Sequence, residues 1–231
     1  MSTRAWKLAM VGTAAIPVFG FAFGGWAVVT VEDLPEYAVA GTPLDLAYTV
    51  RQHGMLLRAD LSGTVIATAA GSSDTVRASS RAFGSTYRAR VTLPHPGDWT
   101  FKINSGFPNN SATLLPVRAV SQGPGAQPPA AFSQTERGSH LFVAKGCATC
   151  HMRENPGPGE WYQIGPNLTG RQYPADYLAT FLADPDKSPL SKTAVGQWRM
   201  PNLGLKPAEI SALVAFINSD ARVATRDTDR R

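Results

Sequence analysis

Cysteine is scarce in this chain of 231 residues: only Cys147 and Cys150 are present, and both lie in one five-residue segment. A disulfide framework needs several cysteines spread along the chain, so the fold is not built on disulfides. Charged residues are also few, at 17%, whereas hydrophobic residues make up 43%, which is enough for a packed core. The length suits two small domains once a targeting segment is set aside.

A long basic stripe is likewise missing. The net charge is +5, with 8 Lys and Arg against 7 Asp and Glu in residues 25–131, and 12 against 10 in residues 132–231. Nucleic-acid binding depends on concentrated positive charge that neutralises phosphates. The charge pattern therefore excludes a nucleic-acid partner.

The first residues have the pattern of an export signal. Arg4 and Lys7 precede an apolar run, Leu8–Phe23, which is short for a membrane span of about 20 residues. Small residues favour cleavage after Gly24, and the alternative is an uncleaved anchor that continues through Val31. Positive charge stays on the cytoplasmic side in both cases, so we expect a periplasmic or other extracytoplasmic location on a bacterial membrane, with a tether if the anchor is retained.

Residues 25–119 are predicted to form a β-domain. Hydrophobic residues alternate with polar ones in three segments: Leu46, Tyr48, Val50; Tyr87, Ala89, Val91, Leu93; and Trp99, Phe101, Ile103. A period of two indicates strands with one buried face, and Pro- or Gly-containing turns separate them. About seven short strands of this kind predict an antiparallel sandwich of immunoglobulin type.

The pattern changes to helical after a Pro- and Gly-rich linker at residues 120–132. Ser133 and Glu136 have the spacing of a capping box at a helix start. Further helices are predicted over Pro174–Ala183 and from Pro207 onward. We expect an all-α domain over residues 133–220, followed by a frayed polar tail at residues 221–231.

The strongest motif is Cys147-Ala148-Thr149-Cys150-His151, the C-x-x-C-H signature of covalent c-type haem. Two thiols at this spacing can form thioethers with both vinyl groups of one porphyrin, and His151 then supplies an imidazole nitrogen to the iron. A redox-active dithiol would need a βαβ context, which the sequence lacks. A zinc site would need two more suitably spaced ligands. The motif predicts one haem c.

With this motif in place, residues 133–220 resemble a class I cytochrome c. The matching residues, in family order, are Gly138, Phe142, Lys145–His151, Ile164–Arg171, Arg199–Leu203 and Phe216. The resemblance implies that the carbonyl of Pro166 accepts a hydrogen bond from the haem histidine. It also implies that Gly138 and Phe142 pack against Phe216 between the first and last helices.

The second iron ligand is expected to be Met200. Two of the other methionines lie in the targeting segment, one in the β-domain and one beside His151: Met1, Met10, Met55 and Met152. The Met-Pro context of Met200 is the one that the resemblance assigns to the distal ligand. Core packing of Met200 and ligation by His140 are the alternatives.

Several residues are candidates for the haem surroundings. Arg171 and Tyr173 are expected to cover or hydrogen-bond the propionates, with core packing as the alternative for the aromatic candidates; the others are Trp161, Tyr162 and Trp198. Candidate charges at the haem rim, which could equally be scattered solubilising charges, are Lys145, Arg153, Lys192, Arg199 and Lys206. A basic rim would steer the chain to an acidic patch on a redox partner.

A His/Met-ligated iron has no open position, so we expect single-electron transfer and no enzymatic reaction. The electron would pass between a donor and an acceptor protein, which could belong to a membrane respiratory complex. The alternatives are a haem enzyme or gas sensor with a displaceable ligand, and a structural haem subunit of a membrane redox complex.

The β-domain resembles immunoglobulin-like domains of exported copper-handling and oxidase-accessory proteins. Its only candidate copper ligands are His53, Met55 and His95, and a docking or spacing module is the favoured interpretation.

Overall fold

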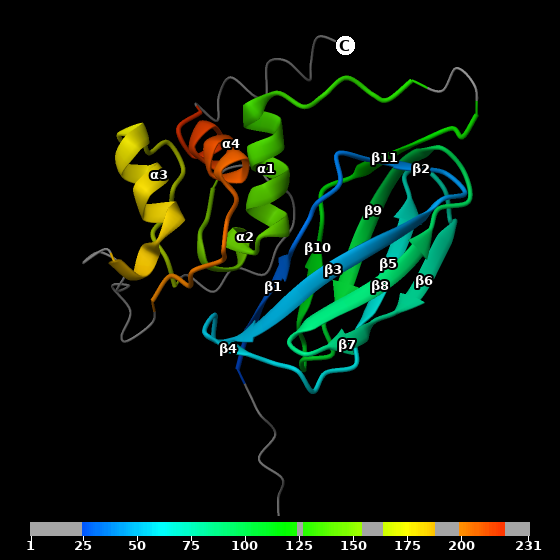
Figure 1. Cartoon of the computed structure of the whole chain (residues 1–231), viewed down its shortest axis with the longest axis horizontal. Coiled ribbons are helices and arrows are strands. Elements are labelled where there is room, and N and C mark those ends of the chain that lie inside the picture. The colour runs from blue at the N-terminus through cyan, green and yellow to red at the C-terminus, as the bar shows by residue number, and fades with distance from the viewer. Residues whose placement is uncertain (1–24, 124–126, 154–163, 188–198, 220–231) are drawn as a thin grey trace, which may run out of the picture.

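The computed structural model describes residues 25–123, 127–153, 164–187 and 199–219, which form a β-region and a helical region packed side by side (Figure 1). The helical elements are α1 (Gln134–Ala144), α2 (Cys147–Cys150), α3 (Ala175–Ala183), a 3-10 turn η1 (Pro185–Lys187) and α4 (Pro207–Ile217). The strands are β1 (Ala27–Val31), β2 (Tyr37–Val39), β3 (Pro43–Gln52), β4 (Leu56–Leu57), β5 (Thr64–Ala69), β6 (Thr75–Ser79), β7 (Arg81–Phe83), β8 (Thr86–Thr92), β9 (Gly97–Asn104), β10 (Ser111–Thr113) and β11 (Val117–Val120).

The strands form two sheets. One has the order β1-β3-β8-β7, with β4 added to β3, and the other has the order β2-β11-β9-β5-β6, with β10 added to β9. The expected number of strands was too low, because β2, β4, β7 and β10 have only two or three residues each, too few to show an alternating pattern. The strand pairs of the described residues are antiparallel, as expected, except that β2 pairs with β11 in parallel.

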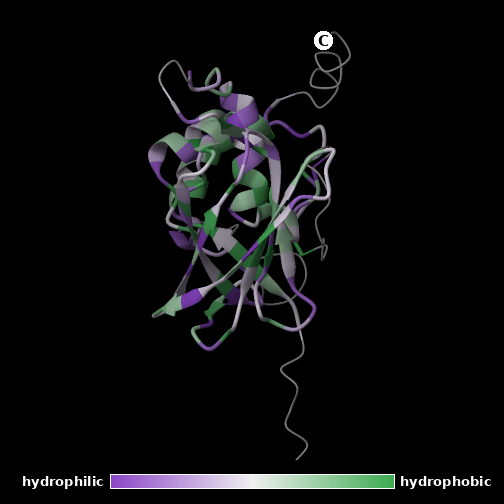
Figure 2. Cartoon of the chain, turned by 90° about the vertical axis from the view of Figure 1, so that its right-hand side faces the viewer, coloured by the Kyte–Doolittle hydropathy of each residue, from purple (hydrophilic) through white to green (hydrophobic). Residues whose placement is uncertain are grey.

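The alternating residues point between the sheets, as predicted. Every residue of the three alternating segments is buried, and Figure 2 shows hydrophobic and hydrophilic residues alternating along the strands. Tyr48 and Tyr87 are fully buried and stack with ring centroids 5.5 Å apart. Their hydroxyl groups are satisfied, because Tyr48 donates to Ser80 Oγ at 2.8 Å and Tyr87 donates to the Arg58 carbonyl at 3.0 Å. Buried phenols therefore add packing without unpaired polar atoms.

The helical region is organised around the crossing of α1 and α4. The predicted capping box is present at the start of α1: Glu136 N–H donates to Ser133 Oγ, and Ser133 N–H donates to Glu136 Oε2. A Cβ atom at Gly138 would lie 2.0 Å from the carbonyl oxygen of Ala212, so only glycine permits this approach. Phe142 and Phe216 pack across the same contact, with ring centroids 5.5 Å apart. The expected packing between first and last helices is confirmed.

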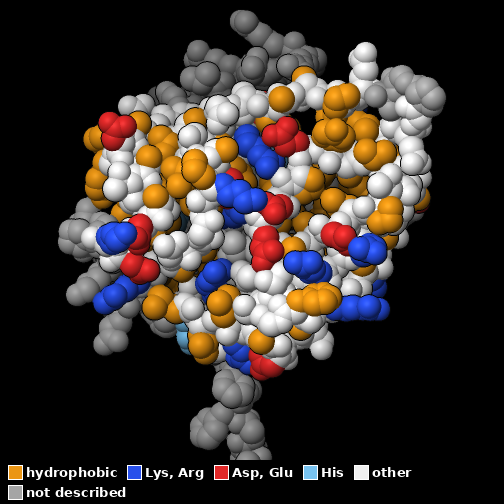
Figure 3. All heavy atoms as spheres, viewed as in Figure 1, with side chains coloured by type: hydrophobic (Ala, Val, Ile, Leu, Met, Phe, Trp, Pro, Cys, Tyr) orange, Lys and Arg blue, Asp and Glu red, His pale blue; other side chains and the backbone are white. Residues whose placement is uncertain are grey.

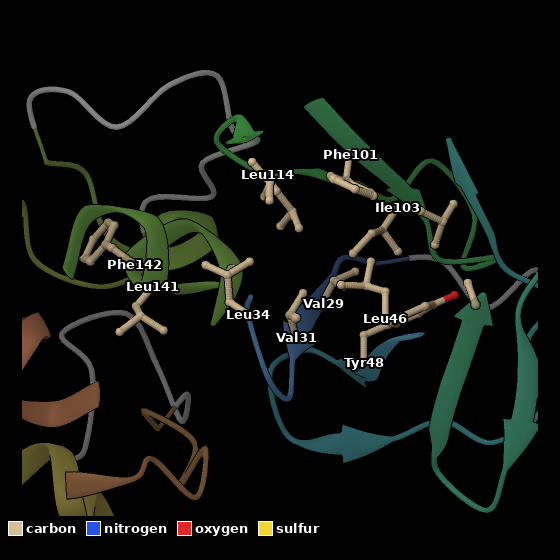
Figure 4. Packing of buried hydrophobic residues seen from close by; sticks show 14 of the residues in the cluster. Val29, Val31, Leu34, Leu46, Tyr48, Phe101, Ile103, Leu114, Leu141 and Phe142 are labelled. Carbon is tan, nitrogen blue, oxygen red and sulfur yellow. The ribbon is translucent and has the colours of Figure 1, made fainter. Parts of the chain in front are cut away.

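The two regions share one buried cluster of hydrophobic residues. All five residues of β1 are buried, although β1 is an edge strand. Figure 4 shows Leu34, which follows β1, between Leu141 of α1 and the side chains of the β-region. The helical region thus covers a sheet edge that would otherwise expose unpaired backbone groups.

Polar contacts fix the same junction. The side chain of Lys145 is almost completely buried, and its Nζ lies 2.8 Å from Glu209 Oε1 and donates to the Glu32 carbonyl at 2.6 Å. Thr30 donates from Oγ1 to the Lys145 carbonyl at 3.3 Å. Arg137 donates to the Leu34 carbonyl at 2.7 Å. One lysine therefore joins α1, α4 and the end of β1, and we name the contacts of Lys145, Glu209, Glu32 and Thr30 the junction cluster.

Among the described residues, no helix is long and apolar enough to cross a membrane. The expected targeting segment at residues 1–24 and the tail expected at residues 221–231 lie outside the described residues.

Removing the lysine of the junction cluster is expected to be costly. Lys145→Ala leaves the carboxylate of Glu209 buried without its partner, and breaking a buried ion pair from one side costs about 3–5 kcal/mol. The free energy of unfolding, measured by urea titration of the holoprotein with far-UV circular dichroism, should fall by that amount.

The control is Lys102→Ala, which removes an exposed lysine on β9 and should change the free energy of unfolding by about 0.5 kcal/mol or less. The double variant Lys145→Met with Glu209→Leu should be more stable than Lys145→Ala, because no charge is left unpaired. Equal stability of Lys145→Ala and Lys102→Ala would contradict the role of the junction cluster.

Candidate haem site

The C-x-x-C-H motif forms a single helical turn, α2. The residue before it, Gly146, allows this turn to pack against the β-region. Gly146 has a φ of 79°, a left-handed conformation that separates α1 from α2. A Cβ atom here would lie 2.4 Å from Val28 Cγ1 and 2.6 Å from the Val29 carbonyl oxygen. Glycine is thus required both for the turn and for the contact with β1.

The two thiols are suited to thioether formation and poorly suited to thiolate chemistry. Cys147 and Cys150 form no disulfide, are partly buried and lie one helical turn apart, which puts them on one face. Burial raises the pKa of the Cys147 thiol to about 12 and that of Cys150 to about 11, so both are protonated at pH 7. Within the described residues no group of three His, Cys, Asp or Glu side chains could hold a metal ion.

The imidazole of His151 is held in one orientation by the segment after the motif. His151 Nδ1 lies 3.0 Å from the Pro166 carbonyl oxygen, and since a carbonyl can only accept, Nδ1 carries the proton and donates. The ring packs against Gly165, where a Cβ atom would lie 2.3 Å from His151 Cε1. Burial lowers the pKa of His151, although the Pro166 hydrogen bond opposes this shift. A neutral ring with Nδ1 engaged leaves Nε2 as the nitrogen available to a metal.

The segment from Ile164 to Arg171 is tied to α2 by its backbone. Gly165 N–H donates to the Cys150 carbonyl at 2.9 Å, and Leu168 N–H donates to the Met152 carbonyl at 2.8 Å. Arg171 donates from Nε to the Asn167 carbonyl at 2.8 Å, which steadies the end of this loop. The structure therefore brings His151, Pro166 and Arg171 into one connected segment, as the motif order suggests.

Tyr173 and Met200 both lie beside the hydrophobic cluster. Tyr173 is half-buried against it, and its backbone exchanges two hydrogen bonds of 2.9 Å with the Asn218 side chain at the end of α4. Met200 is also half-buried and packs on the cluster. The rival ligand, His140, stacks on Phe132 with ring centroids 4.5 Å apart. The other aromatic candidates, Trp161, Tyr162 and Trp198, lie outside the described residues.

Two of the expected rim charges are not on the rim. Lys145 and Arg153 are 3% and 5% exposed, so neither can attract a partner protein. Arg153 donates to the Phe216 carbonyl from both Nε and Nη2, at 3.1 and 2.7 Å, and its guanidinium lies 4.5 Å from the centroid of the Phe216 ring. It thereby satisfies carbonyl groups at the C-terminal end of α4. A signal for this role was present in the sequence. The last turn of α4 contains no basic residue, so a cation that interacts with its carbonyl groups has to come from another segment.

The remaining rim candidates differ from one another. Arg199 is exposed, as expected. Lys206 forms an ion pair with Asp33, so it belongs to the junction between the two regions. Lys192 lies outside the described residues.

The β-region does not bring its two histidines together. In the antiparallel pairing of β3 with β8, Thr49 lies opposite Thr86 and Pro43 opposite Thr92. His53 follows the end of β3 and His95 follows the end of β8, so the two lie at opposite ends of the sheet. His95 Nε2 is instead 2.9 Å from Asp74 Oδ2. This arrangement does not support a shared copper site.

Comparison with known proteins identifies the helical region. Residues 135–220 match the family model described as Cytochrome c. This region is a cytochrome c domain. Cytochrome c domains carry haem c in covalent linkage, so this domain holds haem c. The site suits the group, because two cysteine side chains that form no disulfide lie one turn apart beside an imidazole that has one nitrogen engaged.

The β-region has no comparable assignment. No curated protein matches the chain. Surface layer protein SbsC, domains 1–6, is a solved structure with 20% identity and a TM-score of 0.30; the match covers 42% of this chain and 13% of that one. A conjugative transposon lipoprotein from Bacteroides eggerthii has 15% identity and a TM-score of 0.25; the match covers 38% of this chain and 92% of that one.

The contact between Gly165 and His151 can be tested by substitution. Gly165→Ala would force the imidazole away from the Pro166 carbonyl, because the new Cβ would lie 2.3 Å from the ring. Losing such an orienting contact costs metal sites about 10–100-fold in affinity or activity, so covalent haem per chain should fall about ten-fold or more. Haem staining of a denaturing gel, normalised to protein, measures this yield. Gln172→Ala is the control, since Gln172 is exposed and follows the same segment; equal haem yields in the two variants would contradict the role of the Gly165 contact.

Proposed function

We propose that the chain is an exported monohaem cytochrome that transfers single electrons between respiratory redox proteins through a haem with His/Met ligation. The observation that carries this proposal is the 3.0 Å hydrogen bond from His151 Nδ1 to the Pro166 carbonyl, next to the two thiols of α2. It selects the tautomer in which Nε2 is free, and it raises the basicity of the ring as a ligand.

Each residue of the motif has its own task in this proposal. Cys147 and Cys150 would hold the porphyrin beside α2 through thioethers. His151 ligates the iron through Nε2, and Pro166 holds the ring. Haem c supplies a one-electron iron couple, while the chain supplies the position, the ligands and the exclusion of water.

Met200 completes the ligand set in this proposal. It is half-buried beside the hydrophobic cluster and follows the exposed Arg199. A thioether ligand raises the reduction potential relative to a second histidine, and it closes the last position on the iron. Substrates and gases are then kept from the metal, which favours electron transfer over oxygen or peroxide chemistry. Arg171 and Tyr173 are assigned to the surroundings of the propionates.

The setting of the reaction follows from the same proposal. Residues 1–24 direct the chain out of the cytoplasm as a cleaved signal or as a retained anchor, and electrons pass between a donor and an acceptor protein at the haem edge. Of the expected rim charges, Arg199 is exposed and available for steering. The buried Lys145 and Arg153 are not.

The ligand assignment is tested by comparing two methionine variants. Met200→Ala should lower the reduction potential and open the iron, so that the reduced protein binds carbon monoxide at neutral pH. Met152→Ala is the matched control, because Met152 is 38% exposed and directly follows the haem histidine. Spectra and carbon monoxide binding should be unchanged in the control. An unchanged spectrum in Met200→Ala would refute the assignment.

The attachment residues have a separate test. Replacing both cysteines, Cys147→Ser with Cys150→Ser, should abolish haem that survives on a denaturing gel, because no thiol remains for a thioether. Each single substitution leaves one possible thioether and should lower the yield without removing it. Haem retained covalently by the double variant would contradict the assigned linkage.

A further inference from the structure

The exposed hydrophobic side chains are unevenly distributed. Seven large ones are exposed within the described residues, and four of them lie on two hairpins of one sheet. Met55, Leu56 and Leu57 belong to the β3–β4 hairpin and are 52%, 63% and 43% exposed, while Phe83 on β7 is 60% exposed. We name these four residues the apolar tip. Their exposure is unfavourable in water, so a partner that covers them is indicated.

Strand register places both hairpins at the same end of the sheet. Leu57 pairs with Arg51 near the end of β3, and Phe83 pairs with Thr86 at the start of β8. Thr86 in turn pairs with Thr49, close to the end of β3. The turns after β3 and between β7 and β8 therefore project in the same direction (Figure 1).

The described chain begins at this end as well. Ala27 of β1 pairs with Gln52, and a Cβ atom at Gly25 would lie 2.2 Å from His53 Nε2. The base of the β3–β4 hairpin thus contacts the first described residues. In the sequence the apolar run ends at Phe23, two residues before Gly25, and two residues span at most about 7 Å. The end of the apolar run therefore lies within about 7 Å of Gly25, so a bilayer that held this run would lie close to the hairpin base.

Charge at this end is also suited to a membrane surface. Arg81 and Arg88 lie directly opposite each other on β7 and β8, both exposed, although like charges in such a pair are unfavourable. The guanidinium of Arg88 lies 5.5 Å from the centroid of the Phe83 ring. Lipid phosphates would relieve the repulsion between the two arginines. In Figure 3, hydrophobic, basic and acidic side chains lie side by side at the lower end of the molecule, where the described chain begins.

We propose that the apolar tip is a second membrane contact, which enters the interfacial layer of a phospholipid bilayer beside the N-terminal apolar run. Met55, Leu56, Leu57 and Phe83 reach the acyl boundary, and Arg81 and Arg88 bind headgroup phosphates. The two contacts together fix the direction in which the β-region stands on the membrane, and through the junction cluster they fix the direction of the haem domain. This contact rests on the proposed retention of the N-terminal apolar run as an anchor, and it does not depend on the identity of the haem ligands.

The holoprotein allows a specific labelling test. Both native cysteines are held in thioethers, so one introduced cysteine is the only reactive thiol. The full chain with Leu56→Cys is reconstituted into purified vesicles of zwitterionic and anionic phospholipid, and the initial rate of reaction with a charged, impermeant maleimide is measured. The control is Thr92→Cys, which is exposed at the opposite end of the same sheet. We expect Leu56→Cys to react about ten-fold more slowly than Thr92→Cys.

A second variant separates lipid contact from protection by the chain itself. Adding Leu57→Asp to the Leu56→Cys chain should withdraw the hairpin from the bilayer and restore the labelling rate of the introduced thiol to that of Thr92→Cys. Equal rates in the first comparison would overturn the proposal, as would slow labelling that persists with Leu57→Asp. Protection that grows with the protein-to-lipid ratio would indicate a contact between copies of the chain and would also overturn it. Failure of the full chain to float with the vesicles would also overturn the proposal.

Discussion

The buried ion pair between Lys145 and Glu209 is the contact on which the arrangement of the whole molecule depends. It lies where α1 ends, where α4 begins and where β1 leaves its sheet, and its lysine donates to the Glu32 carbonyl as well. A buried charge pair adds little net stability, but losing either partner is costly, so the pair selects one arrangement. The next two residues are Gly146, which touches β1, and Cys147, so the haem attachment turn is placed by the same contact.

This coupling gives the β-region a physical role. The helical region covers the edge strand β1, and one hydrophobic cluster extends through both regions, so the cytochrome c domain is docked on the β-region through an apolar and polar interface. The haem domain is consequently oriented by whatever holds the β-region. A membrane contact at the apolar tip would present the haem edge to partners in one direction, which shortens the search for a productive encounter.

Much of this could be predicted from the sequence, because its signals are local. The capping box at Ser133, the proline at the start of α4 and the alternation in β3, β8 and β9 depend on residues close in sequence. The contact between His151 and Pro166 followed from a family resemblance. The short strands could not be predicted, because two or three residues are too few to show an alternating pattern. The parallel pairing of β2 with β11 and the burial of Lys145 and Arg153 could not be predicted either, because they depend on residues far apart in the chain. From the sequence alone, a lysine beside a haem motif is expected to be a surface charge. Only the fold shows that Lys145 is buried next to Glu32 and Glu209.

In the proposed function, one closed, six-coordinate haem transfers single electrons. The decisive experiment is spectroelectrochemical titration of the wild-type holoprotein, followed by addition of carbon monoxide to the reduced form. The account predicts a single one-electron transition, low-spin spectra in both oxidation states and no binding of carbon monoxide at neutral pH. A high-spin form in either state, or ready binding of carbon monoxide, would show an open iron and contradict the account.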